Sequence, residues 1–293
     1  EHAELKVSST LANVTLSRFD ELKNTVFTAP TATFGISGSL ALFDGRGELN
    51  GEALTLAWHD DWKHAGVKAM QLEAEGRVPA AWLVENIFKG DGPKLAGVVA
   101  MAATVKQEGG KTAFSATGNA REARVEVPDL NWTKPLGKPL TFAAKGHAET
   151  ADDDLKKLVL TTLQLDGDGT DVAGSVTYVP DVFGATRFKL DPFRLGRTNG
   201  ALTWDGTTLD LTGTSFDFAA LDTDSDTSST LPDLTGRMNV GTMYLKGGNL
   251  TKVNAQFYHR NQVWEAGTIS ALADGTVVDV KETVLPGQGG RKR

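Results

Sequence analysis

Apolar and polar residues alternate along most of this chain with the two-residue period of a β-strand. Leu54, Leu56 and Trp58, for example, share one face of a strand whose other face carries Thr55 and Ala57. The alternation recurs toward the carboxyl end, so each predicted strand has one apolar face. The apolar positions of these further strands are Val99, Met101, Ala103 and Val105, then Ala123, Val125 and Val127, then Phe188 and Leu190, then Leu209 and Leu211, and finally Val253, Ala255 and Phe257.

Turn-forming pairs separate these strands at short intervals. Asn-Gly and Asp-Gly pairs supply the positive φ angles that tight hairpin turns require. The turn signals are Asp44-Gly45, Asn50-Gly51, Gly109-Gly110, Asp166-Gly167-Asp168-Gly169, Asn199-Gly200, Asp205-Gly206, Gly247-Gly248 and Asp274-Gly275. Their spacing predicts a mainly β fold built as a long antiparallel meander, without the strand–helix–strand rhythm of a parallel α/β fold.

Two segments favour short helices. Residues 17–23 begin with a capping box, and residues 79–88 begin with Pro79 at a first-turn position and place Trp82, Leu83 and Ile87 on one stripe. Such a stripe packs on a sheet or serves as a mobile gate, and packing is the more usual role. We therefore expect a first sheet section over residues 1–76, a helix within 77–90, a continuing sheet over 91–293, and a polar loop at 222–230.

Composition excludes several functions for this chain of 293 residues. Its formal net charge is -7 and its only basic cluster is the last three residues, so we expect no nucleic-acid partner. It has no cysteine, which removes disulfides, thiolate metal sites and cysteine nucleophiles and fits either a reducing compartment or the bacterial envelope. No apolar run approaches the ~20 residues of a membrane-spanning helix.

Two groups of residues resemble metal ligands only weakly. His59 and His64 lie five residues apart, but a strand end would point them in different directions. Asp222, Asp224 and Asp226 have the spacing of a calcium loop, yet Thr227 stands where that loop needs glycine. We predict that the chain requires neither a metal nor another cofactor.

No catalytic constellation is evident in the sequence. The segment 35–39 lacks the second glycine of a nucleophile elbow, and the glycines of 45–51 have the wrong spacing for a dinucleotide site. Carboxylates are dispersed on strand exteriors and turns, which gives a paired-carboxylate glycosidase no positive support. We predict that the chain is not an enzyme.

Three passages resemble a known family. Residues 34–58 look like the strand repeats of the bacterial AsmA-like proteins. Within 124–139, Leu130, Trp132, Lys134 and Gly137 resemble a passage of the YhdP branch of that family, as does the run 193–199 followed by Gly213 and 216–218. The chain shows no amino-terminal membrane helix of the family, so we expect it to be a segment of a longer protein.

This resemblance implies an architecture and a role. It implies a long, curled antiparallel sheet that forms an open, apolar groove, within an inner-membrane-anchored protein of the periplasm. It further implies that the groove carries phospholipid acyl chains toward the outer membrane without catalytic residues. Both membranes would be partners of the full-length protein.

Alternation alone does not distinguish an open groove from a closed sandwich or barrel core. The resemblance favours the groove, for which acyl-chain burial supplies about 0.8 kcal/mol per methylene. One alternative is a carbohydrate-binding or structural β scaffold in which Trp62, Trp132 and Trp204 stack on sugars. Our predicted groove residues, which should share one apolar surface, are Leu54, Leu56, Val99, Met101, Val125, Val127, Leu209, Leu211, Val253 and Phe257.

Overall fold

The computed structural model of this chain describes residues 6–17, 23–61, 69–87, 93–108, 111–151, 154–180, 182, 185–220, 233–260 and 263–283. The chain is mainly β-strand, as the alternation predicts, and is divided into two compact units. Unit 1 comprises Glu1–Pro128 and Thr133–Asp168, and unit 2 comprises Asp129–Trp132 and Gly169–Arg293.

Unit 1 contains one antiparallel sheet in the order β1-β2-β3-β4-β5-β6-β7-β10-β11. A short strand, β8, pairs with the beginning of β6. The strands are β1 (Lys6–Ser17), β2 (Val26–Ser37), β3 (Leu40–Leu49), β4 (Glu52–Asp61), β5 (Ala69–Pro79), β6 (Lys94–Glu108), β7 (Lys111–Asn119), β8 (Ala123–Val127), β10 (Leu140–Ala151) and β11 (Asp154–Gly167). The 3-10 turn η1 (Pro128–Leu130) and β9 (Trp132–Lys134) lie at the boundary of the units.

Unit 2 contains a sheet in which each strand pairs with the next one along the chain. Its elements are β12 (Thr170–Tyr178), β13 (Arg187–Leu195), β14 (Thr198–Trp204), β15 (Thr208–Asp217), the 3-10 turn η3 (Phe218–Ala220), β16 (Leu234–Leu245), β17 (Gly248–Arg260), β18 (Val263–Ala273) and β19 (Thr276–Thr283).

One strand pair in unit 2 corrects the prediction of an entirely antiparallel sheet. β15 and β16 are parallel, with Leu211 opposite Met238. In a parallel pair, the connection must return the chain to the end of the sheet at which the first strand began. Residues 218–233 are long enough to do so. The predicted polar loop at 222–230 belongs to this connection and lies outside the described residues.

The turn signals were correct at several positions and wrong at two. Asn50-Gly51, Asp205-Gly206 and Asp274-Gly275 lie between consecutive strands, and Gly247-Gly248 spans the turn into β17. Asp44-Gly45 and Asn199-Gly200 lie instead inside β3 and β14. At Gly200 the backbones of two neighbouring strands approach closely. A Cβ there would lie 2.1 Å from the Thr212 carbonyl oxygen, so no other residue fits without a shift.

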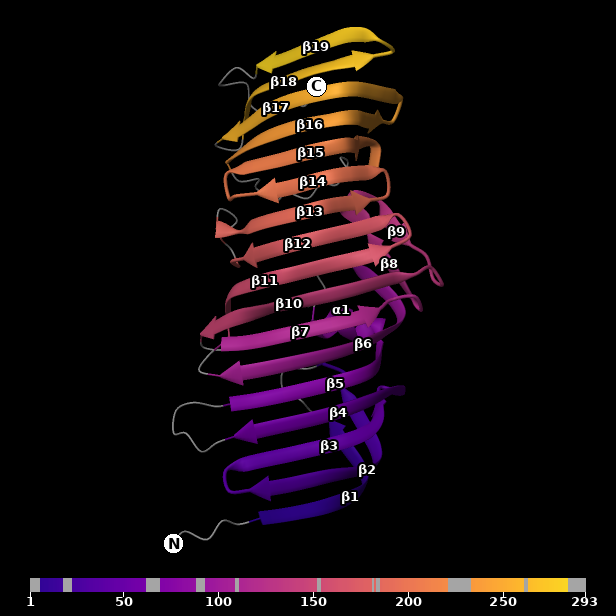
Figure 1. Cartoon of the computed structure of the whole chain (residues 1–293), viewed down its shortest axis with the longest axis vertical. Helices are drawn as coiled ribbons and strands as arrows, with labels where there is room; N and C mark the ends of the chain where they lie inside the picture. The colour runs from indigo at the N-terminus through magenta and orange to yellow at the C-terminus, as the bar shows by residue number, and fades with distance from the viewer. Residues whose placement is uncertain are drawn as a thin grey trace. The chain divides into compact units, whose positions relative to one another are not determined.

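The predicted helix within 79–88 is confirmed as α1 (Ala80–Asn86), which packs against β5 and β6 (Figure 1). Pro79 stands just before it, and Ala80 and Leu83 are its buried residues. The other predicted helix, at 17–23, falls mostly on residues outside the described part of the chain.

Candidate functional site

The strand register of unit 1 aligns small apolar residues into a row that crosses the strands. We call it the central row. In an antiparallel pair, opposite residues project to the same side, so members of the row share one face of the sheet. From β2 to β10 the central row consists of Ala32, Gly45, Leu56, Ala74, Ala103, Ala116 and Ala144.

Two rows with larger side chains flank the central row on the same face. The row nearer α1 consists of Gly47, Leu54, Gly76, Met101, Gly118, Phe142 and Leu165. The row on the other side consists of Phe43, Trp58, Leu72, Val105, Phe114, Gly146 and Leu160. Together, the three rows form what we call the apolar face of unit 1, in which most of the central positions are alanine or glycine.

Aromatic rings on this face lie over glycines, Phe142 over Gly118 of the adjacent strand and Phe43 over Gly45 of its own strand. A Cβ on Gly118 would lie 2.5 Å from the ring of Phe142, and a Cβ on Gly45 would lie 3.1 Å from the ring of Phe43. The absence of a side chain therefore lets each ring lie close to the backbone. Leu56, Met101 and Phe142 remain half-buried rather than sealed.

Unit 2 has an apolar face built in the same way. Leu209 and Phe257 both lie opposite Gly236, where a Cβ would come 1.8 Å from the Phe257 ring. Side chains on this face form a tight cluster in which Val240 and Val253 are each only 1% exposed. The buried members of the cluster are Leu211, Val240, Met243, Val253 and Ala271.

The predicted groove residues fall on these faces in two separate groups, with one exception. In unit 1, Leu54, Leu56, Val99 and Met101 project to the apolar face, Val99 lying opposite Val78. In unit 2, Leu209, Leu211, Val253 and Phe257 project to its apolar face. Their role in binding a lipid stays a prediction.

The exception is the pair predicted at Val125 and Val127. Both belong to β8, where Val125 lies opposite Leu95 at the beginning of β6. That part of β6 precedes Gly97, whose φ of 99° marks a break before the strand continues to Val99. Alternation identified the apolar side of β8, but it could not identify the partner strand.

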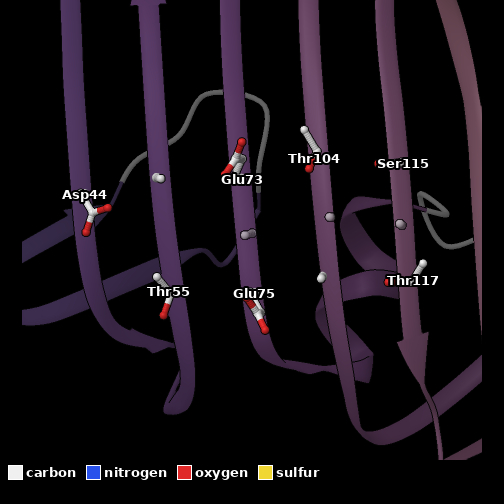
Figure 2. A pocket seen from close by; sticks show the side chains of 12 residues that line it. Asp44, Thr55, Glu73, Glu75, Thr104, Ser115 and Thr117 are labelled. Carbon is white, nitrogen blue, oxygen red and sulfur yellow. The ribbon is translucent and has the colours of Figure 1, made fainter.

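The opposite face of unit 1 is polar and contains a shallow hollow of about 430 Å³ (Figure 2). The labelled side chains over β3 to β7 include the carboxylates of Asp44, Glu73 and Glu75 and hydroxyls of threonine and serine. Basic residues stand in the same rows, since Arg46 lies opposite Thr55 and Lys145 lies opposite Ser115. The polar face thus carries both signs of charge, although the charged residues that line the hollow itself are acidic.

The 130–137 passage, which carries the family resemblance, has a structural role here. Lys134 is only 4% exposed, and its Nζ donates to the backbone carbonyls of Ala120, Arg121 and Ala123 in the turn between β7 and β8. The amide of Gly137 donates to the Arg121 carbonyl at 2.8 Å. Burial lowers the pKa of Lys134 from its usual value.

The second passage of the resemblance forms a clamp in unit 2. The guanidinium of Arg197 donates twice to the Asp217 carboxylate, at 2.8 and 2.9 Å, and lies 4.6 Å from the ring centre of Tyr244. Hydrogen bonding to Asp217 raises the pKa of Arg197. Arg197 therefore ties the β13–β14 turn to the ends of β15 and β16.

The weaker candidates receive no support as sites. Trp204, proposed to stack on sugars, is 3% exposed and thus inaccessible, Trp132 is half-buried, and Trp62 lies outside the described residues. His59 is exposed, whereas His64 and the aspartates of 222–226 also fall outside the described part. Within the described ranges, no three histidine or carboxylate side chains gather as a metal site would require.

Comparisons with protein families, with curated proteins and with solved structures return no match. None of the helices in the described part of the chain has the length and apolar character needed to cross a membrane.

Proposed function

We propose that this chain is a non-enzymatic, lipid-binding segment of an inner-membrane-anchored periplasmic protein of the AsmA-like type. In this proposal, the apolar faces hold the acyl chains of a phospholipid and guide them toward the outer membrane. The observation that carries the proposal is the central row of unit 1, because it is continuous over seven strands and its Leu56, Ala74, Ala103 and Ala116 are half-buried.

The dimensions of the central row suit an acyl chain. Its seven residues are separated by six interstrand spacings of ~4.8 Å, or about 29 Å in total. The hydrocarbon core of a bilayer is ~30 Å thick, so one leaflet contributes about 15 Å. An extended acyl chain therefore fits along the row. Each buried methylene would contribute about 0.8 kcal/mol without any polar contact.

Adjacent residues on β7 provide a matched test of the apolar face. Ala116 lies on it, between Ala103 and Ala144, whereas Ser115 is exposed on the opposite face, between Thr104 and Lys145. Ala116→Asp would place a carboxylate in the acyl path, while the carboxylate of Ser115→Asp would face water and a lysine. We expect Ala116→Asp to remain folded but to lose at least tenfold in affinity for a phospholipid with a fluorescent acyl chain.

The control variant Ser115→Asp should bind that probe as the parent chain does. Circular dichroism and thermal melting would establish that both variants are folded. Equal binding by the two variants would refute the proposed path. Native mass spectrometry of the parent chain purified from bacterial cells provides a test without mutation: we expect co-purified phospholipid, and a lipid-free chain that also takes up no probe would refute the function.

A further inference from the structure

Helix α1 reaches across unit 1 to a segment that is distant in the sheet. It directly follows β5, yet its side chains bond to residues 23–25, which precede β2, and β3 and β4 lie between these two strands. Nε1 of Trp82 donates to Oγ1 of Thr25 at 2.8 Å. The Lys23 amide donates to Oδ1 of Asn86 at 2.7 Å, so both turns of the helix are attached.

The apolar face is closed at the end where α1 lies. Because neighbouring strands are antiparallel, the beginnings of β2, β4 and β6 and the ends of β3 and β5 meet there. The apolar side chains at this end are nearly inaccessible, in contrast with the half-buried Leu56, Ala74, Ala103 and Ala116 of the central row. They are Phe27 at 1%, Leu49 at 6%, Leu54 at 6%, Val78 at 4%, Leu83 at 8% and Val99 at 3% exposure.

The attachment of α1 to residues 23–25 consists of polar contacts, of which the Trp82–Thr25 bond is partly buried and the others are exposed to solvent. Nδ2 of Asn24 donates to the Glu85 carboxylate at 2.9 Å, and this bond and those between Lys23 and Asn86 are exposed to solvent. The helix has only seven residues, no side-chain cap, no acidic residue in its first turn and no basic residue in its last. Helices this short have little stability of their own, and exposed hydrogen bonds contribute little.

From these contacts, we infer that α1 is a strap that closes one end of the apolar face and must release residues 23–25 for an acyl chain to enter there. This inference rests on the proposed function and adds a gate to it. The chain joins α1 to β5 at Pro79 and also continues from α1 to β6, so Pro79 would be the hinge on the β5 side. Release of α1 from residues 23–25 would expose the Phe27 and Leu83 side chains, which would extend the apolar face of unit 1.

Cross-linking tests the strap directly, since the chain has no cysteine of its own. In the double variant Asn24→Cys/Glu85→Cys, a short thiol-reactive linker with a reducible spacer would fasten α1 to the segment before β2. The matched control is Lys138→Cys/Asp168→Cys, which replaces an exposed pair with a 3.0 Å hydrogen bond that lies apart from α1. Uptake of the fluorescent phospholipid from phosphatidylcholine vesicles is followed by stopped flow.

We expect the linked Asn24→Cys/Glu85→Cys protein to take up probe at least tenfold more slowly than the linked control. Reduction of the spacer should restore a rate equal to or above that of the parent chain. Equal rates for the two linked proteins, with the parent chain active, would overturn the strap and leave the proposed function standing. If the parent chain takes up no probe, the proposed function fails, and the strap fails with it.

Discussion

Replacing Lys134 by methionine tests whether one buried ammonium organises the turn between β7 and β8. Methionine preserves most of the apolar stem but removes three donations, to the carbonyls of Ala120, Arg121 and Ala123. A hydrogen bond to a charged group is worth about 1.5–3 kcal/mol, but three bonds from one group are not additive, and the variant avoids the desolvation of the ammonium. We expect a net loss of about 3 kcal/mol in the free energy of unfolding.

Urea unfolding at neutral pH would measure this loss against a control four residues further along. Lys138 is 56% exposed and pairs with Asp168, which is 64% exposed, so Lys138→Met should cost less than about 1 kcal/mol. If the free energies of unfolding of Lys134→Met and Lys138→Met differ by less than about 1 kcal/mol, the ammonium does not stabilise the turn through the three carbonyls.

The stability difference between the parent chain and Lys134→Met should depend on pH. Because burial lowers the pKa of Lys134 below 10.5, the folded state releases this proton at a lower pH than the unfolded state does. Between those two pKa values the unfolded chain binds more protons, and the free energy of unfolding therefore rises with pH. The stability difference between the parent chain and Lys134→Met should widen as the pH rises toward 10.5, and a narrowing difference would contradict this assignment.

Two further substitutions test the apolar face of unit 2. Gly236→Ala should lower the free energy of unfolding by about 1–3 kcal/mol, because the added Cβ would clash with the Phe257 ring. In the control Gly248→Ala, the added Cβ meets no atom within 4 Å. Identical melting temperatures for the two variants would show that the ring is not held against Gly236. Leu211→Asp would bury an unpaired carboxylate at a site that is 5% exposed, which should cost about 3–5 kcal/mol in the free energy of unfolding. In the control Thr212→Asp, the carboxylate lies on the exposed face, and the variant should melt near the temperature of the parent chain. Equal stabilities of the two variants in urea would contradict the burial of Leu211.

The sequence predicted which side of a strand is apolar better than it predicted which strands are neighbours. Leu54 and Leu56 do share a face, because side-chain direction follows from alternation within one strand. The parallel pairing of β15 with β16 depends on a connection of irregular sequence, and no periodicity encodes it. The structural role of Lys134 was not predictable either, because a lysine in a polar segment is expected to be solvated. Its carbonyl partners are identified only in the structure.

The candidate site was predictable only in part for a similar reason. Large residues such as Met101 and Phe257 stand out in an alternating pattern, and they were predicted. The alanines of the central row, such as Ala116 and Ala144, give a weak signal, because alanine occurs on either face of a strand. Their significance arises from the register between seven strands, which glycines and bulges adjust, as at the bulge between Thr28 and Thr31 of β2.

The alanines of the central row have a consequence for the movement of anything bound to the face. If the face carries lipid as we propose, the alanines Ala74, Ala103, Ala116 and Ala144 on successive strands would offer a sliding hydrocarbon similar contacts at each step of ~4.8 Å. A surface of nearly equal, shallow wells presents low barriers to one-dimensional diffusion. It also gives no bias toward either end, so net flux along it would have to be set by the lipid concentrations, or by an energy source, at its two ends.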